Sequence, residues 1–256
     1  MSRRMLPVRA LAAAGTVAVL VAGLGACASA DEDKDPDHRT FAFRGDTLTI
    51  DADDSALEIV AADGHPSGEV EVTRWFQGSV AIGSDPKVTW EMDGDRLKLR
   101  THCSGVVADC ATRHRVEVPR GVAVKVRSDD GSVRARGFRD SLDIRTADGS
   151  VRVSDSSGRL EMRSDDGSLR ADVSARQVKA STQDGSVRLR LTTVPDLVET
   201  RSDDGSVRVS LPRETYKVSA ESDDGSVDVS VPRDDASSHV VDARTQDGEV
   251  TVETAN

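Results

Sequence analysis

Aromatic residues are scarce in this chain, which has two Trp, one Tyr and four Phe among 256 residues. A large globular core usually contains more aromatic side chains than this, whereas a thin aliphatic core does not need them. The five histidines are scattered, and the sequence contains no nucleophile elbow, phosphate loop or His-Glu zinc motif. These absences argue against the common classes of enzyme, and we expect a chain without catalytic residues.

Positive charge is also in short supply. The segment 1–26, which we interpret below as a signal peptide, holds three arginines and no acid, so the rest carries 31 Lys+Arg against 45 Asp+Glu, a net charge of −14. Such an acidic surface argues against nucleic acid and anionic lipid headgroups as partners.

Only one long uncharged apolar run exists, at residues 10–26, and it follows Arg3, Arg4 and Arg9. It is too short for a comfortable transmembrane helix of about 20 residues and fits a signal peptide. Its end, Leu-Gly-Ala-Cys27, resembles the bacterial lipobox, in which the cysteine thiol is lipidated after cleavage before it. We therefore expect export, by the general or the twin-arginine route, and a lipid at Cys27 on the outer face of the cytoplasmic membrane. A plain secretory signal and a transmembrane anchor are the alternatives.

Composition divides the chain into four parts. Residues 1–26 form the signal peptide, and residues 27–40 are the lipidated cysteine and an acidic tether that cannot bury enough apolar surface to fold. Residues 41–120 contain alternating segments without a repeat, and residues 121–256 contain a clear repeat. We expect the third part to be an atypical β cap on the fourth, because an open stack of repeats exposes core and unpaired edge.

Asp-Gly pairs mark the repeat. They recur at spacings of 18, 18, 18, 20, 20 and 23 residues, each between two segments of alternating polarity, and each pair follows a Ser or Thr and one variable residue. Alternation indicates strands with one buried face, so each pair is expected to be a turn, with Gly at positive φ and Asp bonding backbone amides. The pairs are Asp130-Gly131, Asp148-Gly149, Asp166-Gly167, Asp184-Gly185, Asp204-Gly205, Asp224-Gly225 and Asp247-Gly248.

Two all-β folds fit this frame. Asp-Gly is a strong hairpin signal, but hairpins would place Arg127 opposite Arg134 and Arg163 opposite Arg170, and like charges directly opposite destabilise a sheet. A β-solenoid of about seven coils closes its apolar face in every coil, and its columns of Arg and Asp can lie side by side and offset one another. We predict the solenoid; an antiparallel meander or sandwich is the alternative.

The solenoid prediction specifies which residues face inward and where insertions form surface loops. The loops are expected at residues 191–197, 211–216 and 231–239. The predicted inward residues are Val124, Val126, Val133, Leu142, Ile144, Val151, Val153, Leu160, Met162, Leu169, Val178, Val187, Leu189, Val198, Val207, Val209, Val218, Val227, Val229, Val241, Val250 and Val252.

The run from Arg115 to Val126, followed by repeated Ser-Asp-Asp-Gly-Ser-Val-Arg-Val units, resembles the bacterial "putative adhesin" family of β-strand-repeat lipoproteins of unknown function. The resemblance covers about residues 41–254. It implies a β-helical fold at the cell surface and brings no catalytic residues.

Cys103 and Cys110 are the only cysteines besides Cys27, and a disulfide between them is the default in an exported protein. A Cys2His2 zinc site with His102 and His114 is the alternative, although its spacing matches no familiar zinc module. Calcium between neighbouring Asp-Gly turns is conceivable, but turn chemistry already explains these residues, and we expect no cofactor.

Taken together, these features predict a non-catalytic, adhesin-like binding or structural lipoprotein with a protein or glycan partner at the envelope. One alternative is a sensory lipoprotein that acts through a membrane partner. Another is a β-helix enzyme acting on carbohydrate, although the repeats hold only Phe138 and Tyr216 as aromatic side chains for sugar stacking.

Overall fold

The computed structural model describes residues 29–63, 68–80, 82–106 and 108–255. Apart from the short 3-10 turn η1 (Ala30–Glu32), its regular elements are all strands. Their bounds are β1 (Asp37–Ala42), β2 (Thr47–Ala52), β3 (Ser55–Ala62), β4 (Glu69–Val80), β5 (Lys87–Asp93), β6 (Arg96–His102), β7 (Ala108–Pro119), β8 (Ala123–Ser128), β9 (Val133–Arg136), β10 (Leu142–Thr146), β11 (Val151–Ser154), β12 (Leu160–Ser164), β13 (Leu169–Val173), β14 (Gln177–Asp184), β15 (Val187–Leu191), β16 (Leu197–Asp204), β17 (Val207–Leu211), β18 (Lys217–Asp224), β19 (Val227–Val229), β20 (Val240–Asp247) and β21 (Val250–Thr254).

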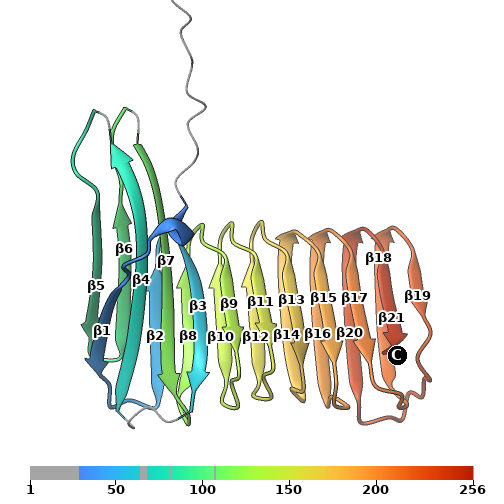
Figure 1. The fold of residues 1–256 in the computed structure, drawn as a ribbon. Helices are drawn as coiled ribbons and strands as arrows, with labels where there is room; N and C mark the ends of the chain where they lie inside the picture. Colours follow the sequence, from blue (N-terminus) through green and yellow to red (C-terminus); the bar gives the residue numbers. More distant parts are fainter. Residues whose placement is uncertain (1–28, 64–67, 81, 107, 256) are drawn as a thin grey trace, which may run out of the picture.

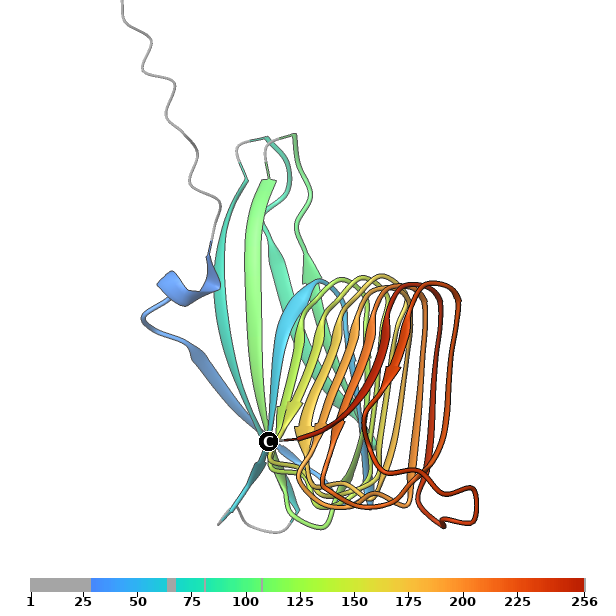
Figure 2. The same cartoon turned by 90° about the vertical axis from the view of Figure 1, so that its right-hand side faces the viewer.

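The strands form two facing sheets that close into a stack of flattened coils (Figures 1 and 2). We call the sheet with the order β1-β4-β7-β3-β9-β11-β13-β15-β17-β21-β19 sheet A, and the sheet with the order β18-β20-β16-β14-β12-β10-β8-β2-β6-β5 sheet B. Each coil in the repeat consists of one strand of sheet B, an Asp-Gly turn, and one strand of sheet A. Neighbouring coils pair in parallel and in register, so that Arg127 lies beside Arg145 on the next coil. The predicted β-solenoid is confirmed, and the hairpin alternative is wrong.

Aliphatic side chains from both sheets fill the space between them, as the alternation predicts. Val133, Val151, Leu169 and Val187 form one continuous inward column on neighbouring strands of sheet A. The two aromatic side chains of the repeats belong to this core: Phe138 and Tyr216 are fully buried, and the Tyr216 hydroxyl donates a 2.8 Å hydrogen bond to the carbonyl of Pro212. Neither ring is exposed as a platform for sugar stacking.

The order of the last two coils differs from the order of the sequence. Strands β20 and β21 are inserted between β16–β17 and β18–β19, so the coil of β18 and β19 ends the stack (Figure 1). Three predicted inward residues are consequently not buried: Val227 is 45% exposed, and Val218 and Val229 are half-buried. The connection 212–216 skips one position in the stack and is as long as 192–196 of the preceding repeat, whereas 230–239, which re-enters the skipped position, is longer than the earlier connections.

The opposite end of the stack shows a similar exchange. Strands β2 and β3 lie between the coil of β6 and β7 and the first repeat coil, β8 and β9. The solenoid therefore extends into the region expected to be a separate cap. Antiparallel strands cover this end, with β4 and β1 added beyond β7 in sheet A and β5 added beyond β6 in sheet B. Strands β4 to β7 project beyond the edge of the stack (Figure 2).

The acidic segment before residue 41 is partly folded, in contrast to the expected tether. Strand β1 begins at Asp37, whose carboxylate pairs with Arg74 at 2.5 Å, and the Asp33 carboxylate accepts a hydrogen bond from the amide of Phe76 at 3.0 Å. Polar contacts with β4, together with the burial of Ala30, hold this segment against the rest of the chain. The signal peptide and Cys27 lie outside the described residues. In the part of the chain that is described, none of the helices has the length and apolarity that a membrane crossing requires.

Candidate ligand-binding face

The outer surface of sheet A carries a straight row of arginines, one on each successive strand. After the first five Asp-Gly turns the chain reads Ser-Val-Arg or Ser-Leu-Arg, and the aliphatic residue points into the core while Ser and Arg point to solvent. The last two turns are followed by Asp228 and Thr251 in place of the arginine. Strand register places the arginines side by side, about 4.8 Å apart. The members, which we call the arginine row, are Arg134, Arg152, Arg170, Arg188 and Arg208.

Four members of this row have no carboxylate partner within the described residues. Only Arg208 forms an ion pair, with Glu253 at 3.2 Å, and the side chains of the other four are exposed. Stacked like charges of this kind destabilise a sheet. We expected columns of Arg and Asp to offset one another, and on this face they do not.

Sheet B provides an internal comparison, because its arginines also stack in register but have acidic neighbours. Most lie two residues from an acid on the same strand, so the ion pair forms locally. The pairs are Arg145–Asp143 (3.3 Å), Arg163–Glu161 (3.0 Å), Arg201–Asp203 (3.1 Å) and Arg244–Asp242 (2.8 Å). The same fold thus presents a face on which most arginines form local ion pairs and, on the opposite sheet, a row in which four arginines form none in the described residues.

A shallow groove runs beside the arginine row, with serine hydroxyls as its second wall. It is lined by Ser132, Ser150 and Ser168, by the arginines two residues after each, and by the backbone of Val133 and Val151. These serine hydroxyls have no hydrogen-bond partner in the described part of the chain. Guanidinium groups and hydroxyls are both donors, so the groove is suited to ligands rich in anionic oxygen.

The Asp-Gly turns form the edge next to this groove. Their geometry differs from the expectation: of the seven turn glycines only Gly248 has positive φ, and no turn aspartate bonds a backbone amide in the described chain. Glycine is needed instead because the turns stack closely. A Cβ on Gly167 would lie 2.1 Å from the carbonyl oxygen of Gly149, and one on Gly185 would lie 2.5 Å from that of Gly167.

Side-chain hydroxyls connect these stacked turns. The Ser or Thr before each Asp-Gly pair is buried, except for the half-buried Ser222, and from the third repeat onward its hydroxyl donates to the carbonyl of the turn glycine on the adjacent coil. The distances are 3.2 Å for Ser164–Gly149, 3.0 Å for Thr182–Gly167, 2.7 Å for Ser202–Gly185 and 2.7 Å for Thr245–Gly205. This ladder was missed in the sequence, although its signal, an invariant Ser or Thr inside the frame, was visible.

The turn aspartates themselves stack into an acidic edge. Asp184, Asp204 and Asp247 are register neighbours on adjacent coils. Desolvation, followed by the charges of Asp166 and Asp204, raises the pKa of Asp184, and desolvation and Asp204 raise the pKa of Asp247. No group of three or more His, Cys, Asp or Glu side chains in the described residues converges as a metal site would require.

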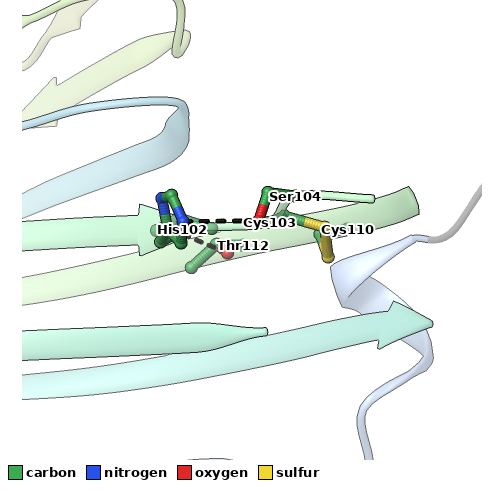
Figure 3. Close-up of a disulfide and its surroundings, with 6 residues drawn as sticks. His102, Cys103, Ser104, Cys110 and Thr112 are labelled. Carbon is green, nitrogen blue, oxygen red and sulfur yellow. Dashed lines mark hydrogen bonds between the residues drawn. A yellow bond between two sulfur atoms is a disulfide. The ribbon is translucent and has the colours of Figure 1, made fainter. Parts of the chain in front are cut away.

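The cysteines lie at the opposite end of the molecule, where the chain passes from β6 to β7. Cys103 and Cys110 form a disulfide with a Cα–Cα distance of 6.3 Å (Figure 3), so neither sulfur is free to bind zinc. His102 is exposed and lies beside Ser104, whereas His114 is fully buried on the inward side of β7. The loop is short, and chain-entropy arithmetic assigns the crosslink about 2.5 kcal/mol.

Comparison with known proteins agrees with this architecture. The family described as Toastrack DUF4097 matches residues 112–253, more than half of the chain. Among curated proteins the sequence has no match.

Among solved structures, a "putative adhesin" from Bacteroides fragilis is similar over 87% of this chain and 98% of its own, with 13% identity and a TM-score of 0.50. A "putative adhesin" and a "putative lipid binding protein" from Parabacteroides distasonis cover 86% and 87% of this chain, and 97% and 98% of their own. They have identities of 14% and 12% and TM-scores of 0.44 and 0.43. The similarity to the Bacteroides fragilis structure supports the fold. None of the three similarities shows a function for this chain.

Proposed function

Because this chain belongs to the Toastrack DUF4097 family, a family of unknown function, we propose a role from its own surface: a non-catalytic binding lipoprotein of the cell envelope. In this proposal a lipid on Cys27 holds the protein at the outer face of the cytoplasmic membrane. The stack of coils then presents a ligand-binding face to the space beyond. No cofactor is needed for such a role.

The unbalanced arginine row on sheet A is the observation that supports this proposal most. Arg152 and Arg170 stand on adjacent strands whose backbones are fixed by parallel pairing on both sides, so their positions are held without a ligand. Pre-organised groups lose little freedom on binding. A row of cations that the chain itself leaves unneutralised, on a rigid flat face, is what a binding surface for an anion requires.

The proposed anchor is close in sequence to the part of the chain that the structure describes. Cys27 precedes by two residues Ser29, the first described residue, and η1 packs against β4 and β7 at the covered end of the stack. A lipid at Cys27 would therefore be joined to this end. Two or more acyl chains anchor a protein stably, since each buried methylene contributes about 0.8 kcal/mol.

Localisation can be tested in cells with the full chain and its Cys27→Ser variant. We expect the wild-type protein in the detergent phase of a membrane extract and sensitive to protease added to spheroplasts. The Cys27→Ser variant should leave the detergent phase or keep its signal peptide. Protease protection of the wild type in intact spheroplasts, or unchanged partitioning of a processed Cys27→Ser variant, would overturn the proposed anchor.

A further inference from the structure

We propose that the arginine row and the serines beside it bind a linear, phosphate-bearing polymer that runs along the solenoid axis, across the strands. This inference rests on the proposed binding function and specifies its ligand. The four unpaired arginines, Arg134 to Arg188, span three strand spacings, about 14 Å. One extended polymer can contact all of them at once.

The arginine row has defined limits along the solenoid axis. Glu58 is the register neighbour of Arg134 at one end, and Glu253 pairs with Arg208 at the other. On one flank the next outward residue differs from strand to strand: it is Arg136 on β9, Asp172 on β13 and Arg190 on β15. On the other flank stand the turn aspartates. A planar membrane would meet these carboxylates together with the arginines, whereas a single chain laid on the row avoids them. The geometry therefore favours a linear polymer over a lipid surface.

Counter-charges are present beside most arginines of sheet B, Arg127 being an exception within the described residues, and they are missing from Arg134 to Arg188 along this row. The chain has 45 Asp and Glu in total, and on sheet B they neutralise Arg145 and Arg163 in the equivalent coils. A column of unneutralised arginines costs stability through like-charge repulsion. An external polyanion bound along the column would neutralise the arginines and remove that cost. The folded protein should therefore be more stable with the polyanion bound than without it.

The donors favour phosphate among anionic groups. Arginine forms bidentate hydrogen bonds with phosphate oxygens, and each serine hydroxyl two residues earlier adds a donor on the same face. Ser150 with Arg152, and Ser168 with Arg170, repeat this pair on successive strands. The arginine row has no aromatic side chain of the kind that stacks bases at single-stranded nucleic acid sites, which favours a phosphate polymer without bases.

Binding to linear polyphosphate tests the proposal directly, with detergent-extracted mature protein and measurement by calorimetry or anisotropy. Affinity should rise with chain length from pyrophosphate until the polymer spans the row, and should fall as salt is added. The double variant Arg152→Gln/Arg170→Gln should lose at least tenfold in affinity. Its matched control, Arg145→Gln/Arg163→Gln on sheet B, changes net charge equally and should lose less than twofold.

Thermal unfolding supplies a second readout on the same variants. The sheet A double variant should be at least as stable as the wild type without ligand, because it loses repulsion, and long polyphosphate should raise its Tm less than that of the wild type. Equal loss of affinity in both double variants, or no dependence on polymer length, would overturn the proposal.

Three other probes separate the remaining ligand classes. Polygalacturonate, single-stranded DNA and phosphatidylglycerol vesicles should each bind more weakly than polyphosphate through the arginine row. Equal or tighter binding by any of them would overturn the phosphate-polymer assignment. The spheroplast experiment is independent of this outcome, so a wrong ligand would be distinguishable from a wrong location.

Discussion

The hydroxyl of Thr182 donates a hydrogen bond of 3.0 Å to the carbonyl oxygen of Gly167, one coil earlier in the stack. The same contact joins Ser202 to Gly185 in the next coil, at 2.7 Å. Backbone hydrogen bonds connect neighbouring strands within each sheet, and these hydroxyl hydrogen bonds connect neighbouring turns between the two sheets. The turn edge beside the arginine row is therefore tied together from coil to coil.

Replacing Thr182 with valine should destabilise the protein by about 1–3 kcal/mol, because it leaves a buried carbonyl without its donor. Chemical denaturation of the full chain measures this change. Thr182→Ser keeps the hydroxyl and should recover much of the loss. If Thr182→Val and the wild type unfold at the same denaturant concentration, the ladder contributes nothing.

Glycine at the turns should be irreplaceable for a reason that is independent of φ. Gly167→Ala places a methyl group 2.1 Å from the carbonyl oxygen of Gly149 and 2.5 Å from the Ser164 hydroxyl, so backbone must move. We expect a loss of about 1–3 kcal/mol, as for other overpacked sites. Ser168→Ala, at the exposed next position, should change the free energy of unfolding by less than about 0.5 kcal/mol.

The sequence alone was sufficient to predict the coils but not their order. The fixed frame around each Asp-Gly pair identified strands, turn and inward face together, and most inward residues are buried as predicted. Strands β18 and β20 carry the same inward pattern, Val-x-Ala, at Val218 and Val241. An exchange of the two coils changes no alternation, so only the longer connection between them, residues 230–239, could indicate it.

For a similar reason, only part of the candidate site could be predicted from the sequence. Arginine columns follow from the repeat, but their neutralisation depends on which residue stands two positions away on the same strand. Before the turn that residue is an acid in most repeats, as in Asp143-x-Arg145, although Lys125 precedes Arg127. After the turn it is a serine, as in Ser150-x-Arg152. Assigning the two halves of each repeat to opposite sheets places Arg134, Arg152, Arg170 and Arg188 together on one face.

Acid should destabilise the fold through His114. This side chain lies in a column with Leu57 and Val133, both of its ring nitrogens lack hydrogen-bond partners, and desolvation followed by the charge of Arg74 lowers its pKa to about 3. The unfolded chain binds a proton near pH 6.5, so the free energy of unfolding falls as the pH drops from 6.5 towards 3.

The variant His114→Leu should remove this pH dependence and match the aliphatic column. Relative to the variant, the wild type should lose about 3–5 kcal/mol between pH 7 and pH 3. Carboxylate titrations common to both proteins cancel in the difference, which denaturant unfolding across this range would measure. Parallel stability curves for the two proteins would contradict the role given to His114.

The stacked turn aspartates should have the opposite effect on stability, which should rise as the pH falls. The pKa of Asp184 is raised by desolvation and by Asp166 and Asp204, so its ionised form lowers stability at neutral pH, and this effect disappears as the pH falls through the raised pKa. Asp184→Asn should therefore unfold at higher temperature than the wild type at pH 7, with the gap closing towards pH 4. Asp235→Asn, an equal charge change in an exposed loop, should produce no such gap.

The exchanged end coils can be tested with two valines that occupy equivalent sites in successive repeats. Val250 is fully buried on β21, and Val227, its register partner on β19, is 45% exposed because its coil ends the stack. Val250→Asp would bury an unpaired carboxylate and should cost several kcal/mol, whereas Val227→Asp should cost about 1 kcal/mol or less. Stacking in sequence order would place the coil of β18 and β19 between two others and leave that of β20 and β21 at the end. In that case Val227→Asp would be the damaging change, and equilibrium unfolding of the two variants distinguishes the two arrangements.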